Sequence, residues 1–238
     1  MNKFGYPGVT IIIPARNEEE SITEIIQELN QSGYDNILVV DGNSRDRTVE
    51  NAKENGAEVI VQEGNGKGAA LRQAFNHSNL NGDLVVIIDA DGSMNPKEIP
   101  LLLKTLDSGA DLAKGSRFLP YGYSEDMTLI RRIGNRFFVS LVNWFWSADY
   151  TDLCYGLAAF NRGVIEKLGS DLKSTNFEIE TEVFIKAKKL GLKVIEVPSI
   201  EFRRRYGKSN LSNLRDGIRI LKTIFRELID RRAKREAQ

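Results

Sequence analysis

The sequence predicts an α/β fold, in which a mostly parallel, doubly wound β-sheet is flanked by helices within a single domain. Two observations predict it. Short β-branched runs such as residues 9–13 alternate with helical patterns through the first half of the chain, and most residues of these runs are apolar, as in strands buried on both faces. This alternation requires crossover connections that place helices on both faces of a parallel sheet. Such sheets bind ligands at the carboxyl ends of their strands.

Periodicity and turn residues place the individual elements. Five strands are expected in the first half, at 9–13, 37–40, 59–61, 84–88 and 112–114, separated by helices at 22–29, at 44 or 46 to 55, at 68–77 and from 96 onward. The second half should hold a loop-like stretch at 119–136, an aromatic helix at 137–146, a strand at 157–161, a helix at 178–190, a strand at 194–197 and a terminal helix at 214–228 with a wide apolar face. No repeat or linker divides residues 1–238, so we expect one domain.

Composition excludes several classes of protein. The 33 Lys and Arg residues balance 33 Asp and Glu residues, and a net charge of zero disfavours a nucleic-acid binder. One cysteine, Cys154, and one histidine, His77, exclude a disulfide framework and a zinc site built on these residues. No apolar run resembles a signal peptide or approaches the ~18 residues of a membrane span. We therefore expect a cytoplasmic location.

Two carboxylates stand at the end of one predicted strand. Asp89 and Asp91 flank Ala90 directly after the run 84–88. Carboxylates in this arrangement can hold a hard divalent cation and share it with substrate phosphates. The alternative is a solvated turn, but placement at the ligand-binding edge of the sheet favours the metal site.

Other polar residues follow neighbouring strands. Pro14, Ala15, Asn17 and Glu18 leave the first strand, and Asp41 ends the second. Each acid taken alone is explained by a helix N-terminus or a turn. Their convergence on one edge of the sheet with Asp89 favours a ligand site, where carboxylates suit ribose hydroxyls or a base edge as acceptors.

Two further segments carry phosphate-binding chemistry. The loop 64–69 contains three glycines and Lys67, so backbone N–H groups and an ammonium can approach a phosphate or a base, although a flexible loop has the same composition. Arg203, Arg204 and Arg205 form a dense cationic run. Guanidinium groups bind phosphate bidentately, so this run suits a pyrophosphate clamp.

The segment 137–146 holds two Trp and three Phe residues and follows Arg131, Arg132 and Arg136. Its composition is typical of a core helix. The same composition also suits an element at a membrane surface, because aromatic side chains insert at the interface and arginines contact anionic lipid.

Taken in order, these motifs resemble the family-2 glycosyltransferases of the GT-A fold. The resemblance rests on Pro14-Ala15-Arg16-Asn17-Glu18, Asp41-Gly42-Asn43-Ser44, Asp46-Arg47-Thr48, Gly66-Lys67-Gly68 and Asp89-Ala90-Asp91. A narrower similarity, to dolichol-phosphate mannose synthases and polyprenyl-phosphate glycosyltransferases, rests on Lys114-Gly115-Ser116-Arg117, Asp152 with Gly156, Phe177-Glu178 and Arg204-x-x-Gly207-x-Ser209. The whole resemblance runs from residue 9 to about residue 225.

The resemblance implies roles for particular residues. The nucleotide would be lined by Pro14, Ala15, Asn17, Glu18, Asp41, Lys67 and Ala90. Asp89 and Asp91 would hold Mg²⁺ or Mn²⁺ and the donor diphosphate, Arg204 would bind phosphate, and Arg117 and Arg131 would hold the acceptor phosphate. Residues 1 to about 118 would then form the nucleotide-sugar-binding half, and residues from about 119 to 238 an acceptor-binding half with amphipathic helices.

The sequence also departs from this family. Ser93 stands where dolichol-phosphate mannose synthases often carry a Gln metal ligand, Asn210 replaces the usual Lys after Ser209, and the carboxy-terminal transmembrane helices of many relatives have no counterpart. The donor chemistry is therefore better specified than the acceptor.

The activity expected is transfer of a sugar, with inversion, from a nucleotide-sugar such as GDP-mannose or a UDP-sugar to a polyprenyl or dolichyl phosphate, with peripheral contact to the cytoplasmic membrane face. A lipid phosphate is already ionised and needs little general base, whereas a soluble hydroxyl acceptor would make Asp152 the candidate base. Two other classes remain open: a haloacid-dehalogenase-like phosphatase with Asp89 as nucleophile, and a non-catalytic nucleotide-sugar binder.

Overall fold

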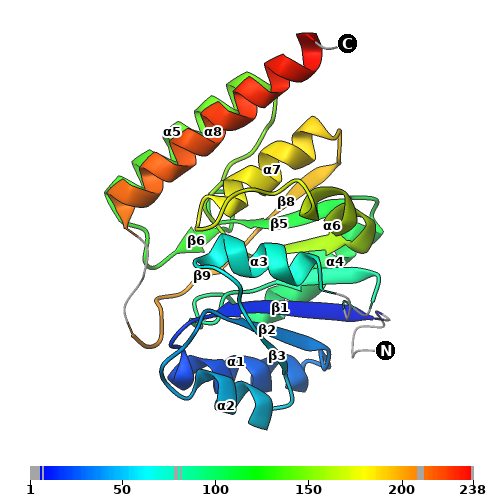
Figure 1. Ribbon diagram of the computed structural model, residues 1–238, viewed down its shortest axis with the longest axis vertical. Coiled ribbons are helices and arrows are strands. Elements are labelled where there is room, and N and C mark those ends of the chain that lie inside the picture. The colour runs from blue at the N-terminus through cyan, green and yellow to red at the C-terminus, as the bar shows by residue number, and fades with distance from the viewer. Residues whose placement is uncertain (1–5, 7, 78–79, 81, 208–211, 237–238) are drawn as a thin grey trace.

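The computed structural model describes residues 6, 8–77, 80, 82–207 and 212–236. A seven-stranded sheet lies at its centre in the order β3-β2-β1-β4-β7-β5-β8 (Figure 1). The strands are β1 (Val9–Ala15), β2 (Ile37–Asp41), β3 (Glu58–Val61), β4 (Leu84–Ile87), β5 (Leu112–Ser116), β7 (Ala158–Asn161) and β8 (Val194–Pro198). All neighbouring strands are parallel except β7, which runs antiparallel between β4 and β5. The predicted single-domain α/β fold with a mostly parallel sheet is confirmed.

Helices connect the strands and cover both faces of the sheet (Figure 1). They are α1 (Glu19–Gln31), α2 (Thr48–Glu54), α3 (Lys67–Phe75), the 3-10 turn η1 (Pro96–Glu98), α4 (Ile99–Asp107), α5 (Leu129–Trp146), α6 (Arg162–Gly169), α7 (Ile179–Lys189) and α8 (Asn213–Glu236). A two-stranded sheet of β6 (Tyr123–Ser124) and β9 (Ile200–Glu201) lies apart from the main sheet.

Alternation along β1 divides the core into two layers. Ile11 and Ile13 pack against α1 and α4 on one face, while Ile12 packs on the other face with the apolar side chains of α3, α6 and α7. All three isoleucines are completely buried, which contributes about 1.5–3 kcal/mol each through the hydrophobic effect. Helices therefore cover both faces of the sheet at β1, and the carboxyl ends of the strands remain as the place where a ligand can bind.

The structure corrects two predictions in the second half. Residues 129–136, expected as loop, form the first two turns of α5, whose N-terminus is capped by the Thr128 hydroxyl accepting the backbone N–H of Arg131. The helix α6 and the strands β6 and β9 were not predicted. The wide apolar face expected on α8 is also split: Ile220 and Ile224 face the core, while Leu214 and Phe225 are exposed.

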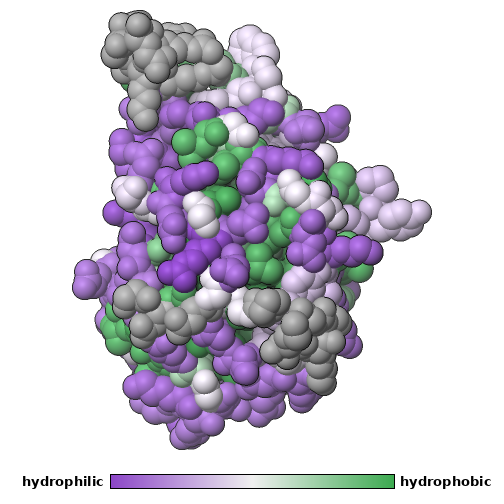
Figure 2. All heavy atoms as spheres, turned by 90° about the vertical axis from the view of Figure 1, so that its right-hand side faces the viewer, coloured by the Kyte–Doolittle hydropathy of each residue, from purple (hydrophilic) through white to green (hydrophobic). Residues whose placement is uncertain are grey.

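The aromatic segment 137–146 is helical, with one set of side chains buried in the core and another exposed; its contact with a membrane stays a prediction. Phe138, Val142 and Trp146 recur every four residues and are buried, whereas Phe137 and Trp144 are exposed. On the face shown in Figure 2, hydrophobic side chains gather in the upper part between hydrophilic ones, and the lower end is mostly hydrophilic. Among the described residues, no helix combines the length and apolar character needed to cross a membrane.

Candidate active site

Asp89 and Asp91 follow β4 and lie at the carboxyl edge of the sheet, as predicted. Their side chains are 24% and 22% exposed, so both carboxylates reach the surface of a cleft. The backbone N–H of Ser93 donates to Asp91 Oδ1 at 3.0 Å and fixes the turn. This hydrogen bond orients the Asp91 carboxylate at the cleft.

Lys67 begins α3 and lies between two carboxylates. Its Nζ is 2.6 Å from Asp89 Oδ1 and 2.7 Å from Oε1 of Glu180, which α7 supplies. Burial opposes the charge on Lys67, but the two carboxylates outweigh it and hold the pKa of the ammonium above its usual value. Burial raises the pKa of Glu180, and Lys67 opposes that rise.

The glycine loop before α3 is tightly packed. Gly66 has a φ of 91°, and a Cβ there would lie 2.4 Å from the carbonyl oxygen of Thr175. A side chain at position 66 would therefore push away the segment that leads into α7. The loop is a close contact between the two halves of the chain, which brings Lys67 to Glu180.

Arg204 extends from the segment after β9 to the same edge of the sheet. Its guanidinium donates to Glu18 Oε1 and, at 3.3 Å, to Asp91 Oδ2. Burial raises the pKa of Glu18, and the Arg204 charge opposes that rise. Arg204 thus lies next to the carboxylate pair, where a diphosphate can replace Glu18 or Asp91 as its acceptor.

Two pockets open at this edge. The strand-edge pocket, of about 350 Å³, is lined by Pro14, Ala15, Glu18, Gln62, Gly66, Lys67, Asp89, Ala90, Asp91, Asn176, Phe177 and Arg204, among others. The helix-pair pocket, of about 240 Å³, lies beneath α5 and α8 and is lined by Arg117, Met127, Ile130, Arg131, Gly134, Phe138, Glu180, Glu201, Gly217 and Ile220, among others. Lys67, Asp89, Asp91 and Arg204 line both. The two pockets therefore meet at the carboxylates.

Two residues that were predicted to contact the nucleotide, Asn17 and Asp41, accept hydrogen bonds from the backbone of neighbouring loops. The exposed Asn17 has a φ of 54°, and its side-chain oxygen accepts the backbone N–H of Arg45 at 2.8 Å. Asp41 is 2% exposed and accepts the backbone N–H of Ser44 at 3.1 Å. Both residues shape loops beside the strand-edge pocket, and their contact with a nucleotide stays a prediction. Ser209 and Asn210 lie outside the described residues.

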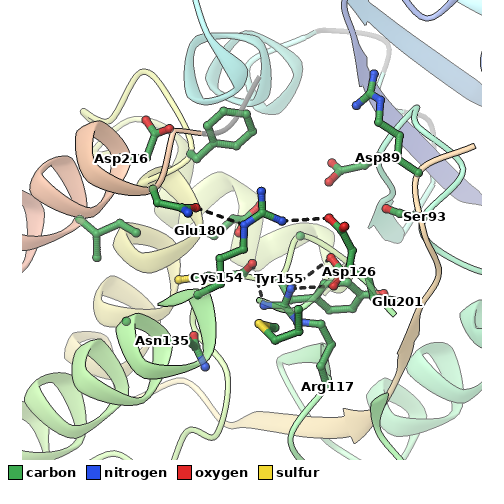
Figure 3. Close-up of a pocket in the computed structure, with 18 of the residues that line it drawn as sticks. Asp89, Ser93, Arg117, Asp126, Asn135, Cys154, Tyr155, Glu180, Glu201 and Asp216 are labelled. Atoms are coloured by element: carbon green, nitrogen blue, oxygen red, sulfur yellow. Dashed lines mark hydrogen bonds and ion pairs between the residues drawn. The ribbon is translucent and has the colours of Figure 1, made fainter. Parts of the chain in front are cut away.

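The arginines of the helix-pair pocket differ in availability. The Arg117 guanidinium makes five hydrogen bonds, to Asp152, to Glu201 and to the carbonyl oxygen of Cys154, so each of its five N–H groups has a protein acceptor. Arg131 donates to Asp126 at 2.9 Å and to Asn213 at 3.2 Å and is 27% exposed. Figure 3 shows Arg117 and Glu201 on one side of this pocket and Asn135 and Asp216 on the other.

Asp152 lies beneath the pocket. It is completely buried, and Arg117 donates hydrogen bonds to both of its carboxylate oxygens. Burial alone would raise the pKa of Asp152, but Arg117 outweighs it and lowers that pKa. This geometry suits a residue that positions Arg117.

Sequence analysis missed Glu180, Glu201 and Asp216, all of which line the helix-pair pocket. The only sequence signal for Glu180 is the acidic run 178–182 at the start of a helix, which a helix dipole explains equally well. Glu201 lies in the unpredicted strand β9.

A family model for Glycosyl transferase family 2 matches residues 10–169. The chain belongs to this family. The chain is 36% identical over 219 residues to Glycosyltransferase AglJ of Haloferax volcanii, and the match covers 92% of this chain and 71% of AglJ. It is 28% identical to the dolichyl-phosphate hexose transferase of the same organism over 98% of this chain and 100% of that protein.

A solved structure supports the fold. Glucosyl-3-phosphoglycerate synthase of Mycobacterium tuberculosis, crystallised with Mn²⁺, UDP-glucose and phosphoglyceric acid, has a TM-score of 0.73 and 23% identity, covering 95% of this chain and 81% of that one. The family-2 chain therefore has the GT-A fold and is a hexosyltransferase enzyme, as predicted. The phosphatase and the non-catalytic alternatives find no support.

Proposed function

We propose that the protein transfers a hexose, with inversion, from a nucleotide-sugar to a polyprenyl or dolichyl phosphate. The observation that carries this proposal is the junction of the two pockets at Asp89 and Asp91. A nucleotide in the strand-edge pocket places its diphosphate at Lys67 and Arg204. The sugar then faces the helix-pair pocket, and attack from that side, opposite the leaving diphosphate, inverts the anomeric carbon.

Asp89 and Asp91 fit a Mg²⁺ or Mn²⁺ ion. Their hard carboxylate oxygens face an open cleft, and within the part of the chain that the structure describes no cluster of three or more His, Cys, Asp or Glu side chains is placed to hold a metal. A two-carboxylate site that leaves positions for water and diphosphate is typical of Mg²⁺. When bound, the ion neutralises charge on the leaving diphosphate.

The pocket favours a phosphate acceptor over a hydroxyl. Arg117 and Arg131 put two guanidiniums in the helix-pair pocket, and a phosphate monoester has its second ionisation near pH 6, so it is already a nucleophile at neutral pH. A hydroxyl needs a base, and Asp152 is sealed behind Arg117. In this proposal Arg131 contacts the acceptor phosphate directly. Arg117 also contacts it, and for this the phosphate replaces the Glu201 carboxylate as the hydrogen-bond acceptor of Arg117 Nη1.

Exposed apolar side chains on α5 and α8 support peripheral binding to an anionic membrane surface. They are Leu129, Ile130, Ile133, Phe137 and Trp144 on α5, and Leu214, Ile218, Phe225 and Ile229 on α8. Arg132 and Arg136 are exposed among those of α5. Apolar side chains interleaved with arginines are the pattern by which amphipathic helices hold to the interface of anionic membranes. The helix-pair pocket lies beneath these two helices, so a lipid acceptor would reach it from the cytoplasmic membrane face.

The test measures release of nucleoside diphosphate when the enzyme is given a short polyprenyl phosphate, Mg²⁺ or Mn²⁺, and each of GDP-mannose, UDP-glucose and UDP-N-acetylglucosamine. Turnover that requires the lipid phosphate is the expected result. Glycosylation of a soluble hydroxyl compound, with no turnover on any lipid phosphate, would overturn the proposed acceptor.

A further inference from the structure

Two helix glycines line the helix-pair pocket. Gly134 lies inside α5 and Gly217 inside α8, and both line the pocket. A Cβ on Gly134 would lie 3.9 Å from Phe138 Cε2, and a Cβ on Gly217 would lie 3.8 Å from Phe138 Cζ. Among the described residues beyond the adjoining helix backbone, no other heavy atom would lie within 4 Å of either Cβ. These are ordinary van der Waals contacts. The protein therefore has room for a side chain at both positions.

Neither glycine is needed by the backbone. Neither has a positive φ, and a glycine inside a helix destabilises it by about 0.5–1 kcal/mol relative to alanine. Gly68 in α3 is different, because a Cβ there would lie 2.6 Å from the carbonyl oxygen of Ser174, so packing requires that glycine. At Gly134 and Gly217 neither the backbone conformation nor a close contact requires glycine, and both positions line the pocket, so the missing side chains widen it.

The lining near these glycines combines a cation with apolar side chains. Arg131 lies three residues before Gly134 on the same face of α5. The lining also includes the apolar side chains Met127, Ile130, Phe138 and Ile220. The pocket holds about 240 Å³ in total, and an apolar cavity of about 150 Å³ already admits a benzene molecule.

We propose that Gly134 and Gly217 open a slot for the hydrocarbon chain of the acceptor next to its phosphate, and so determine the preference for a prenyl phosphate over a small polar phosphate. This inference rests on the proposed function. With the phosphate at Arg131, the first apolar units of the chain lie against the two glycines and the Phe138 ring, which line the same pocket. Any side chain at either position would fill the slot from the helix side.

Alanine variants separate stability from acceptor binding. Gly134→Ala and Gly217→Ala should raise the melting temperature and lower kcat/KM for a prenyl phosphate. Gly163→Ala is the matched control, because Gly163 also lies in a helix, α6, has no atom within 4 Å of a Cβ and does not line the pocket. It should leave kcat/KM unchanged. Both measurements use the full chain.

Leucine variants test the slot directly. In Gly217→Leu and Gly134→Leu, the ratio of kcat/KM for citronellyl phosphate to kcat/KM for ethyl phosphate should fall by about tenfold or more, since losing apolar contacts in a pocket costs about this much discrimination. Calorimetric binding of the nucleotide-sugar to each variant reports whether the sheet edge is still folded.

The outcomes distinguish the inference from the function on which it rests. Wild-type turnover of citronellyl phosphate, with an unchanged ratio in the leucine variants and unchanged kcat/KM in the alanine variants, would overturn the slot and leave the proposed function standing. If the wild-type enzyme turns over no lipid phosphate, the proposed function fails, and the slot fails with it.

Discussion

Arg117 and Asp152 form a bidentate ion pair beneath the helix-pair pocket. Nε lies 2.7 Å from Oδ2, Nη2 lies 3.0 Å from Oδ1, and Asp152 is completely buried. Nη1 donates to both oxygens of Glu201 at 3.1 Å. Desolvation opposes the charge on Arg117, but Asp152 outweighs it and raises the pKa of the guanidinium. The guanidinium is therefore held rigid and charged by one buried and one partly exposed carboxylate.

Asp152→Asn should destabilise the protein by about 3–5 kcal/mol. Removing one partner of a buried ion pair leaves the other charge uncompensated. The free energy of unfolding from urea titration measures the loss. Asp126→Asn is the control, because Asp126 is half-exposed in its pair with Arg131, and such pairs contribute about 0–1 kcal/mol. Equal, small losses in both variants would contradict the role given to Asp152.

Arg131→Ala should raise the acceptor KM or lower kcat by tenfold or more, about 1.4 kcal/mol, because it removes a charged donor from the phosphate. Glu201→Gln should lower the acceptor KM, since it weakens the group that competes with phosphate for Arg117. Steady-state kinetics with a short prenyl phosphate measures both. Arg132→Ala, which changes an exposed neighbour outside the pocket, is the control. An Arg131→Ala enzyme with wild-type kinetics would argue against a phosphate at α5.

Asp91→Ala should abolish transfer and most Mg²⁺- or Mn²⁺-dependent binding of nucleoside diphosphate. It removes one of the two carboxylates at the cleft. The unliganded melting temperature should stay within a few degrees, because Asp91 lies partly exposed at the cleft and outside the apolar core. Calorimetry with and without the metal measures the binding. Asp126→Ala alters only the helix-pair pocket and should bind normally. Full activity of Asp91→Ala would refute its assignment.

Trp144→Ser and Ile133→Ser should each weaken co-sedimentation with anionic vesicles, because both side chains are exposed on α5, 77% and 61% respectively. Added salt should weaken binding as well, through the arginines. The control is Val61→Ser, an exposed apolar residue on the edge strand β3, at the other end of the sheet. Vesicle binding that is equal in all three variants would exclude α5 as the contact.

Tyr34 makes the protein sensitive to alkali. It is 1% exposed, and burial raises the pKa of its hydroxyl from 10.0 to about 12. Between these values the unfolded chain loses the proton and the folded chain keeps it, so stability falls as pH rises, by about 1.4 kcal/mol per pH unit. Tyr34→Phe should flatten this fall in urea titrations between pH 10 and 12. Tyr121→Phe, at a tyrosine that is 92% exposed, should not.

Part of the site could be predicted because it follows directly from strand ends. Asp89 and Asp91 come directly after an apolar run, so recognising the strand also places the carboxylates at the sheet edge. Residues 129–136 were predicted as loop although Leu129, Ile133 and Phe137 recur every four residues, as on one face of a helix. In the structure this face is exposed, so only the tertiary structure shows that the helix presents it outward and not to the core.

The sequence by itself determined the α/β class, the succession along the chain of the first five strands and the helices between them, and the place of two carboxylates at the carboxyl edge of the sheet, because periodicity, turns and strand ends are local properties of the chain. Only the tertiary structure decided that Lys67 lies between Asp89 and Glu180, that Arg117 is paired with Asp152 and Glu201, and that Gly134 and Gly217 line one pocket. These pairs join distant segments. A buried charge needs a partner, and which partner it meets depends on how the helices pack on the sheet. In the same way, a helix glycine lines a cavity only where the neighbouring elements leave space beside it.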